Sequence, residues 1–328
     1  MAMDSLINIC YTCFDSSSTV SLKSLINAEP KDHRHLLHLF LFADYQQNCA
    51  QDVQQIQSLC KQENVQVTLL PFERIKDFCN QRNFPSYHGY LLNYARLFLP
   101  ELLPGVHKII YLDSDTLVLK PIDQLWTESL NGMPIGAVHS YDASFGNGSA
   151  LEKRETFNDG VLLMDLDALR SQGFIEWVRQ LTSKDIDGCL DQGIVETFCF
   201  SKTEYLPLKY NSLCFLRSLS YRQYLKDYSD FRRLSKKEFY VAQRKPVIVH
   251  FNGNAYDRPW HQYSRSKYLF LWRRLYRQVY RKALKPQPFP KTSLKMRIFR
   301  RIMQSVAICL PGRFYYWLSN AIGGKRFR

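Results

Sequence analysis

The order of apolar and amphipathic segments in the first 72 residues constrains the fold more than any other feature. Three apolar, strand-like segments, LINICYTCF at 6–14, HLLHLFLFA at 35–43 and VQVTLLPF at 65–72, are separated by segments of helical character at 22–27 and 46–64. Strands that alternate with helices are typical of a parallel sheet covered by helices. The sequence therefore predicts an α/β fold.

The alternation continues along the chain. We expect a helix over 90–99, a single strand over 109–119, strands at 136–140 and 161–166, a helix opening at 190 and a last strand within 246–253. With 45% hydrophobic and 14% aromatic residues, a chain of 328 residues can bury a full core. This composition excludes disorder for most of the chain.

Positive charge is concentrated at the C-terminal end. Residues 261–328 contain 17 of the 44 Lys and Arg residues and none of the 30 Asp and Glu residues, so the residues before them are close to neutral. This change in composition predicts a main domain over 1–262 and a basic tail over 263–328.

The cysteine content and the N-terminal segment indicate the cellular compartment. Nine cysteines scattered from Cys10 to Cys309 do not make a disulfide framework in a long chain and favour a reducing compartment. Cys10 and Cys13 lie in an apolar run, where buried thiols are expected rather than a redox or zinc site. There is no signal-like N-terminal segment, and no window reaches the roughly 18 apolar residues of a membrane span. We therefore expect a cytoplasmic protein without a helical anchor.

The predicted strand IIYLDSDTLVL at 109–119 carries two carboxylates, Asp113 and Asp115. Residues i and i+2 of a strand share a face, so we expect the two carboxylates to converge. Carboxylate oxygens suit Mg²⁺ or Mn²⁺, and the C-terminal end of a strand in an open α/β sheet is where a nucleotide phosphate binds. A divalent cation there would stabilise a diphosphate leaving group. An isolated D-x-D is more often a solvated turn, so its context decides.

Four segments place this D-x-D among further motifs: NYARLFLPELLPGVHKIIYLDSDTLVLKPIDQLW, FNDGVLLMDLDALR, LDQGIVE and HFNGNAYDRPWH. In this order they resemble the retaining glycosyltransferases of family 8, over roughly residues 5–262. The resemblance implies a GT-A fold, in which a nucleotide-binding α/β sheet is merged with an acceptor-binding half. It also implies a UDP-sugar donor, a hexose such as galactose or glucose as the transferred group, and Mn²⁺, or else Mg²⁺, as the cofactor.

The resemblance assigns the site residue by residue. Asp113, Asp115 and the strand-ending His250 are expected to bind the metal ion. The candidate catalytic residues are Arg96 of YARL, which is expected to reach the donor sugar and diphosphate, and Asp191 and Gln192 of LDQG, beside the sugar hydroxyls and the reacting carbon. The candidate donor-binding residues are Asp15, Arg96, Asp113, Ser114, Asp115, Asn158, Asp159, Gly160, Asp191, Gln192, His250, Gly253 and Arg258.

Several of these residues are also compatible with a purely structural role. His250 is also compatible with a buried histidine satisfied by hydrogen bonds, and Arg96 with an ion pair on a helix surface. Gly160 is compatible with a bulge at the start of a strand. Asp191 is compatible with a helix N-cap, and this role does not exclude the role beside the donor sugar.

Three positions depart from the family pattern. Phe14 replaces the first acid of the pair that holds the uracil, which leaves Asp15 alone. Arg258 replaces a Lys that contacts the diphosphate, with two extra residues before it. Gly193 follows Gln192 where the family often has Asp.

The resemblance also implies a transfer that retains the anomeric configuration. An amide is a poor nucleophile, so we favour attack by the acceptor hydroxyl on the face that the leaving group departs from. The departing UDP oxygen, stabilised by Mn²⁺ and Arg258, would accept the proton.

The tail over 263–328 predicts a peripheral contact with an anionic membrane. Its first part places Tyr268, Trp272, Leu275, Tyr276 and Val279 at helical spacing with Arg and Lys between them. A tail of this kind favours a lipid-linked saccharide acceptor, such as lipopolysaccharide or lipooligosaccharide core, at the inner face of a bacterial membrane. One alternative is a tail that docks on its own domain. Another is a non-catalytic protein whose tail binds a membrane or nucleic acid, although we expect no nucleic-acid partner.

Overall fold

The computed structural model describes residues 6–30, 36–47, 49–139, 156–186, 189–214, 216, 220–228, 234–252, 257–262 and 264–288. Gly253 and residues 289–328, which include most of the basic tail, lie outside the described residues.

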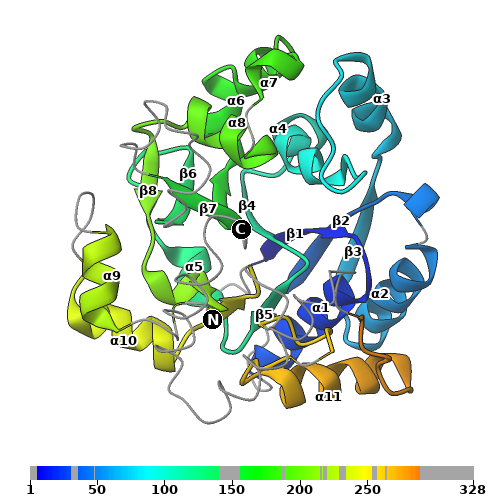
Figure 1. The fold of residues 1–328 in the computed structure, drawn as a ribbon. Helices are drawn as coiled ribbons and strands as arrows, with labels where there is room; N and C mark the ends of the chain where they lie inside the picture. Colours follow the sequence, from blue (N-terminus) through cyan, green and yellow to red (C-terminus); the bar gives the residue numbers. More distant parts are fainter. Residues whose placement is uncertain are drawn as a thin grey trace, which may run out of the picture.

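The centre of the molecule is a mixed sheet of seven strands in the order β3-β2-β1-β4-β7-β6-β8 (Figure 1). The first four strands in this order run parallel, and β7 is antiparallel to both β4 and β6. The predicted parallel strand-helix alternation is thus confirmed for the N-terminal half. The seven strands are β1 (Ile7–Cys13), β2 (Leu37–Ala43), β3 (Gln66–Leu70), β4 (Lys108–Leu112), β6 (Ile135–His139), β7 (Phe157–Asp165) and β8 (Thr203–Tyr205).

Helices cover both faces of the sheet because its strands are apolar on both sides. In β1, Ile9 and Tyr11 pack into one hydrophobic cluster with the helices α1 and α2, whereas Cys10 packs into a second cluster on the other face. The helices of the described residues are α1 (Ser16–Ala28), α2 (Ala50–Gln62), α3 (Glu73–Gln81), α4 (Leu99–Leu102), α5 (Asp123–Thr127), α6 (Leu166–Ser171), α7 (Phe174–Val178), α8 (Leu190–Phe198), α9 (Tyr221–Tyr228), α10 (Lys236–Arg244) and α11 (Leu269–Tyr280).

The single strand expected over 109–119 is two strands in two different sheets. β4 ends at Leu112, and β5 (Thr116–Val118) belongs to a small sheet with β10 (Ile248–His250) and β9 (Ser212–Leu213). The three residues between them form a turn, in which the backbone N–H of Thr116 donates to the carbonyl of Asp113. The expectation failed because apolar residues flank the turn on both sides and make one continuous strand-like pattern.

The helix expected over 90–99 is a 3-10 helix over Leu92–Phe98 that continues into α4. Every residue of this 3-10 segment is buried. A segment surrounded by the core shows no amphipathic period in its sequence, so its helix type could not be read from spacing.

The first part of the predicted tail folds onto the body of the protein. α11 lies beside α1 and α2 (Figure 1), and its Trp272, Leu275 and Tyr276 are buried against residues that include Val20 of α1. The Tyr280 hydroxyl hydrogen-bonds to Thr19 of α1 and to Asp52 of α2. The apolar face that was expected to meet lipid is therefore covered by protein, as in the docking alternative.

The outer face of α11 keeps its positive charge. Arg274 and Arg277 are exposed, as is Arg281 just after the helix, and Phe270 is 84% exposed. No helix among the described residues has the length and apolar character needed to cross a bilayer.

Candidate functional site

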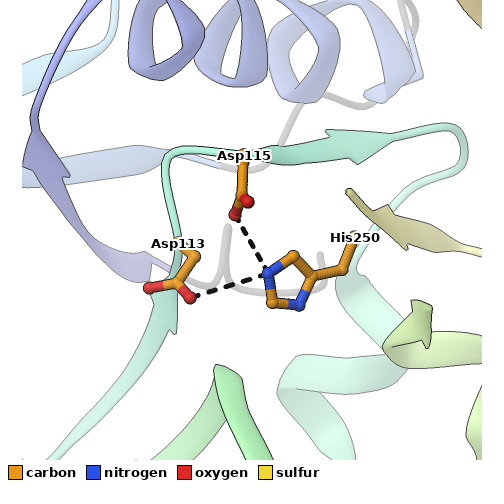
Figure 2. Close-up of side chains that lie close together, drawn as sticks. All are labelled: Asp113, Asp115 and His250. Carbon is orange, nitrogen blue, oxygen red and sulfur yellow. Dashed lines mark ion pairs between the residues drawn. The ribbon is translucent and has the colours of Figure 1, made fainter. Parts of the chain in front are cut away.

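Two aspartates and a histidine meet where the large and the small sheet adjoin. The turn after β4 carries Asp113 and Asp115, and His250 ends β10. His250 Nε2 lies 2.9 Å from Asp115 Oδ1 and 3.7 Å from Asp113 Oδ2. Figure 2 shows the imidazole pointing toward both carboxylates. One ligand atom from each residue can be chosen so that all three lie within 4.8 Å of one another.

The two aspartates converge by a route other than the expected strand pleat. The Asp113 N–H donates to the carbonyl of Gly160 (2.8 Å), and the Asp115 carbonyl accepts from the N–H of Phe251 (2.9 Å). Asp113 is thus tied to β7 and Asp115 to the residue that follows β10, and the turn brings the two carboxylates to the histidine.

Two asparagines orient the imidazole of His250. Nδ1 lies 3.0 Å from Asn158 Oδ1 and 3.2 Å from Asn211 Oδ1, and Asn211 Nδ2 donates to Asn158 Oδ1 at 2.7 Å. Because both contacts of Nδ1 are acceptors, Nδ1 carries the proton and Nε2 faces the carboxylates. Asn211 is fully buried and belongs to none of the motifs, so sequence reasoning missed it.

Replacing Asn211 with alanine is expected to weaken Mn²⁺ binding by roughly 10- to 100-fold, because it removes an acceptor that orients a ligand histidine. Titration of free Mn²⁺ by electron paramagnetic resonance measures this. Asn27→Ala, an exposed change in the last turn of α1, is the control and should leave the affinity unchanged. Equal Mn²⁺ affinity in both variants would contradict this role of Asn211.

Gly160 leaves room for the histidine and the first aspartate. A Cβ at this position would lie 2.2 Å from His250 Cε1, 2.7 Å from His250 Nδ1 and 2.7 Å from Asp113 Oδ2. Gly160 lies in β7 where the pairing with β6 shifts register, since Ala137 pairs with Leu162 and Val138 with Asn158. The bulge alternative and the close approach to His250 and Asp113 therefore hold together.

Arg96 lies at the centre of three carboxyl groups and is only 4% exposed. Its Nη2 is 2.9 Å from Asp113 Oδ1, its Nη1 2.8 Å from Asp159 Oδ2, and its Nε 3.0 Å from Asp191 Oδ2. The guanidinium also stacks on the ring of Tyr111, 4.0 Å from the centroid. It is therefore a buried organising cation and not a salt bridge on a helix surface.

The site holds more carboxyl groups than basic side chains. Burial raises the pKa of Asp159 and Asp191, and Arg96 opposes the rise in both. Burial alone would raise the pKa of Asp115, but the contact with His250 outweighs it and lowers that pKa. For His250, burial would lower the pKa, but Asp115 and Asp113 outweigh it and raise the pKa.

This donor set fits a divalent cation. Four carboxyl groups surround one guanidinium and one imidazole, so a cation would balance charge that the protein leaves uncompensated. Two carboxylates and a neutral imidazole nitrogen are suitable ligands for Mn²⁺ or Mg²⁺ and leave positions open for phosphate oxygens.

Asp191 and Gln192 lie in the first turn of α8, beside this cluster. Asp191 Oδ1 accepts from Asn93 Nδ2 at 2.8 Å, while the N-cap position belongs to Cys189. Asp191 is thus held by side-chain partners and does not cap the helix. Gln192 Nε2 donates to Glu196 Oε1 at 3.1 Å. Sequence reasoning missed Asn93 and Glu196.

The remaining predicted residues have contacts of their own. Asp15 caps α1 by accepting from the Ser17 N–H. The ring of Phe14 packs edge-on against Tyr90, with centroids 5.6 Å apart. Arg258 Nε donates to the carbonyl of Phe251, next to His250, and its charge acts on Asp115. Ser114 lies partly exposed between the two aspartates.

The chain is similar to known proteins in sequence and in fold. The model of the family described as "Glycosyl transferase family 8" matches residues 14–264. "Probable galacturonosyltransferase 9" of Arabidopsis thaliana is 29% identical over 207 residues, which cover 57% of this chain and 33% of that protein. The glycosyltransferase GlyF of Streptococcus pneumoniae is 28% identical over 195 residues, which cover 58% of this chain and 44% of that protein. The chain spans less than half the length of either relative.

Solved structures share the fold. The galactosyltransferase LgtC, in complex with donor and acceptor sugar analogs, superposes with a TM-score of 0.61 at 21% identity and covers 89% of this chain and 99% of its own. The bifunctional glycosyltransferase WbbM superposes with a TM-score of 0.62 at 19% identity, covering 92% of this chain and 52% of its own. The expected GT-A architecture is confirmed by these likenesses.

Proposed function

Because the chain belongs to glycosyltransferase family 8, we propose that it transfers a hexose, galactose or glucose, from a UDP-sugar to a saccharide acceptor with retention of anomeric configuration. The observation that carries this proposal is the convergence of Asp113, Asp115 and His250 within 4.8 Å, beside the buried Arg96. Membership of an enzyme family favours transfer over the non-catalytic alternative.

In this proposal the metal ligands are Asp113, Asp115 and His250. A bound Mn²⁺ or Mg²⁺ would neutralise the diphosphate and stabilise the charge that develops on it as it leaves. Arg258, held beside the end of β10, adds a positive charge on the same side. Arg96 keeps Asp113, Asp159 and Asp191 in fixed positions, because all three of its nitrogens pair with them.

The contacts of Asp191 favour attack by the acceptor hydroxyl on the face that the diphosphate leaves. They argue against a covalent intermediate on Asp191. One of its carboxylate oxygens accepts a hydrogen bond from Asn93, and the other lies 3.0 Å from Arg96 Nε in an ion pair without a hydrogen bond, so both are engaged electrostatically. An engaged carboxylate is a weaker nucleophile. In the proposed step the bond from the anomeric carbon to the diphosphate oxygen breaks with its electron pair. The acceptor oxygen bonds to that carbon on the same face, and its proton passes to the departing oxygen.

A panel of UDP-sugars tests the proposal. We expect UDP release from one UDP-hexose in the presence of Mn²⁺, with a product whose anomeric configuration, determined by NMR, matches that of the donor. Inversion of the configuration would rule out the retaining mechanism. A glycosyl group trapped covalently on Asp191 or Gln192 would rule out the same-face route.

The acceptor and the membrane contact are a further part of the proposal. We place a lipid-linked saccharide, such as lipooligosaccharide core, as the acceptor and the cytoplasmic face of a bacterial membrane as the location. The support is the charge of residues 261–328, with 17 basic and no acidic residues, together with the exposed basic face of α11. The protein should sediment with anionic vesicles and not with neutral ones at physiological salt. Equal sedimentation with both would remove this part of the proposal.

A further inference from the structure

Gln192 and Glu196 are four residues apart on α8, so their side chains lie on the same face of the helix. The Gln192 Nε2 to Glu196 Oε1 distance is 3.1 Å. The same oxygen of Glu196 accepts from the backbone N–H of Phe157 at 3.3 Å. Phe157 is the first residue of β7, the strand that carries Asn158 and Gly160. Glu196 therefore connects the helix that holds Gln192 to the strand that lines the metal cluster.

The chemistry of this contact determines which way the Gln192 amide points. An ionised carboxylate can only accept hydrogen bonds, so the NH₂ group of the amide must face Glu196. The opposite orientation would set the amide oxygen against a carboxylate oxygen. The carboxylate thus fixes which atom of the amide faces it, and the carbonyl oxygen of Gln192 is directed away from Glu196.

We infer that Glu196 is a positioning residue that holds the Gln192 amide with its carbonyl oxygen toward the reacting carbon of the donor sugar. This inference rests on the proposed function, and the resemblance to family 8 is what places Gln192 beside that carbon. As the bond to the diphosphate breaks, positive charge develops on the anomeric carbon, and a preorganised carbonyl dipole stabilises it. Without Glu196 the amide turns freely and can present its NH₂ group, which is unfavourable next to that charge.

Two substitutions separate the hydrogen-bond role of Glu196 from its charge. Glu196→Met removes the acceptor at similar volume and should lower kcat by roughly tenfold, with KM for the donor changed by less than about twofold. Glu196→Gln keeps an acceptor oxygen and loses the charge, so it should retain most of kcat. Glu101→Met is the matched control, because Glu101 pairs with Arg179 on the surface, and it should leave both constants unchanged.

The same substitutions in a Gln192→Ala background complete the experiment. If Glu196 acts only through Gln192, Glu196→Met has no further effect on kcat in that background. An equal tenfold loss there, an unchanged kcat in Glu196→Met alone, or a loss in Glu196→Gln as large as in Glu196→Met would each overturn the inference while the wild-type activity stands. Absence of UDP release by the wild-type protein from every UDP-sugar would instead refute the proposed function, and the inference with it.

Discussion

Replacing Gly160 with alanine is expected to abolish Mn²⁺ binding and to lower turnover by roughly 100-fold or more. The new Cβ would lie 2.2 Å from His250 Cε1 and 2.7 Å from Asp113 Oδ2, closer than carbon atoms tolerate. Both neighbours are fixed, since Asp113 pairs with Arg96 and the His250 imidazole is held by Asn158. The imidazole must therefore leave the position that it shares with the two aspartates.

Titration of free Mn²⁺ in the presence of UDP measures the effect of this substitution. Gly105→Ala is the matched control, because a Cβ at Gly105 meets no atom within 4 Å. If the Gly160 variant bound Mn²⁺ as the wild-type protein does, the site would not depend on the placement of His250 that the structure shows.

Replacing Arg96 with methionine is expected to lower the free energy of unfolding by roughly 3–5 kcal/mol, because it leaves buried carboxylates without their cation. Asp113, Asp159 and Asp191 would then face one another without a counter-ion, and the side chains of Asp159 and Asp191 are only 9% exposed. Methionine fills much of the volume of the arginine side chain, so the loss of charge dominates over the loss of packing. Urea unfolding measures the change.

The destabilisation by Arg96→Met should also depend on pH. Burial already raises the pKa of Asp159 and Asp191 in the folded state, and loss of the guanidinium, which opposes this rise, raises their pKa further above the unfolded value. Groups with a raised folded pKa bind protons more tightly in the folded state, so lowering the pH stabilises that state relative to the unfolded chain. The difference from the wild type should therefore be smaller at about pH 5 than at neutral pH. A difference that grows as the pH falls would contradict the role of Arg96 as a counter-ion.

Sequence reasoning reached the fold because strands and helices alternate with distinct hydrophobic periods. β1, β2 and β3 were placed within a residue or two, and the strand pairing between them is parallel as expected. The strand over 109–119 was the main error. The turn at Asp113 to Asp115 is stabilised by partners more than 40 residues away, Gly160 and Phe251, and no local pattern marks such a turn.

Only part of the candidate site was predicted, because some of its residues are brought together by contacts that are distant in the sequence. Asp113, Asp115 and His250 belong to motifs, and the structure brings them together. Asn211 lies outside the motifs, and Asn93 opens the NYARL motif without an assigned role; both gain a role only when the fold buries them beside His250 and Asp191. A buried polar side chain needs a partner, but its sequence position does not say which partner it will find.

The tail shows the limit of amphipathic patterns. The spacing of Trp272 and Tyr276 predicted one apolar helix face, and α11 has such a face. Whether an apolar face packs against lipid or against protein depends on what surface lies nearby, and here α1 and α2 supply it. The basic residues of the same helix remain exposed on its outer side.

The most direct test of the account is UDP release from the preferred UDP-hexose, measured with Mn²⁺, with Mn²⁺ plus excess chelator, and with Asp115→Asn. The account predicts release with Mn²⁺ that disappears with the chelator and in the variant, because Asp115 is one of the metal ligands that hold the diphosphate. Release that persists in both conditions would contradict a catalytic metal site at Asp113, Asp115 and His250.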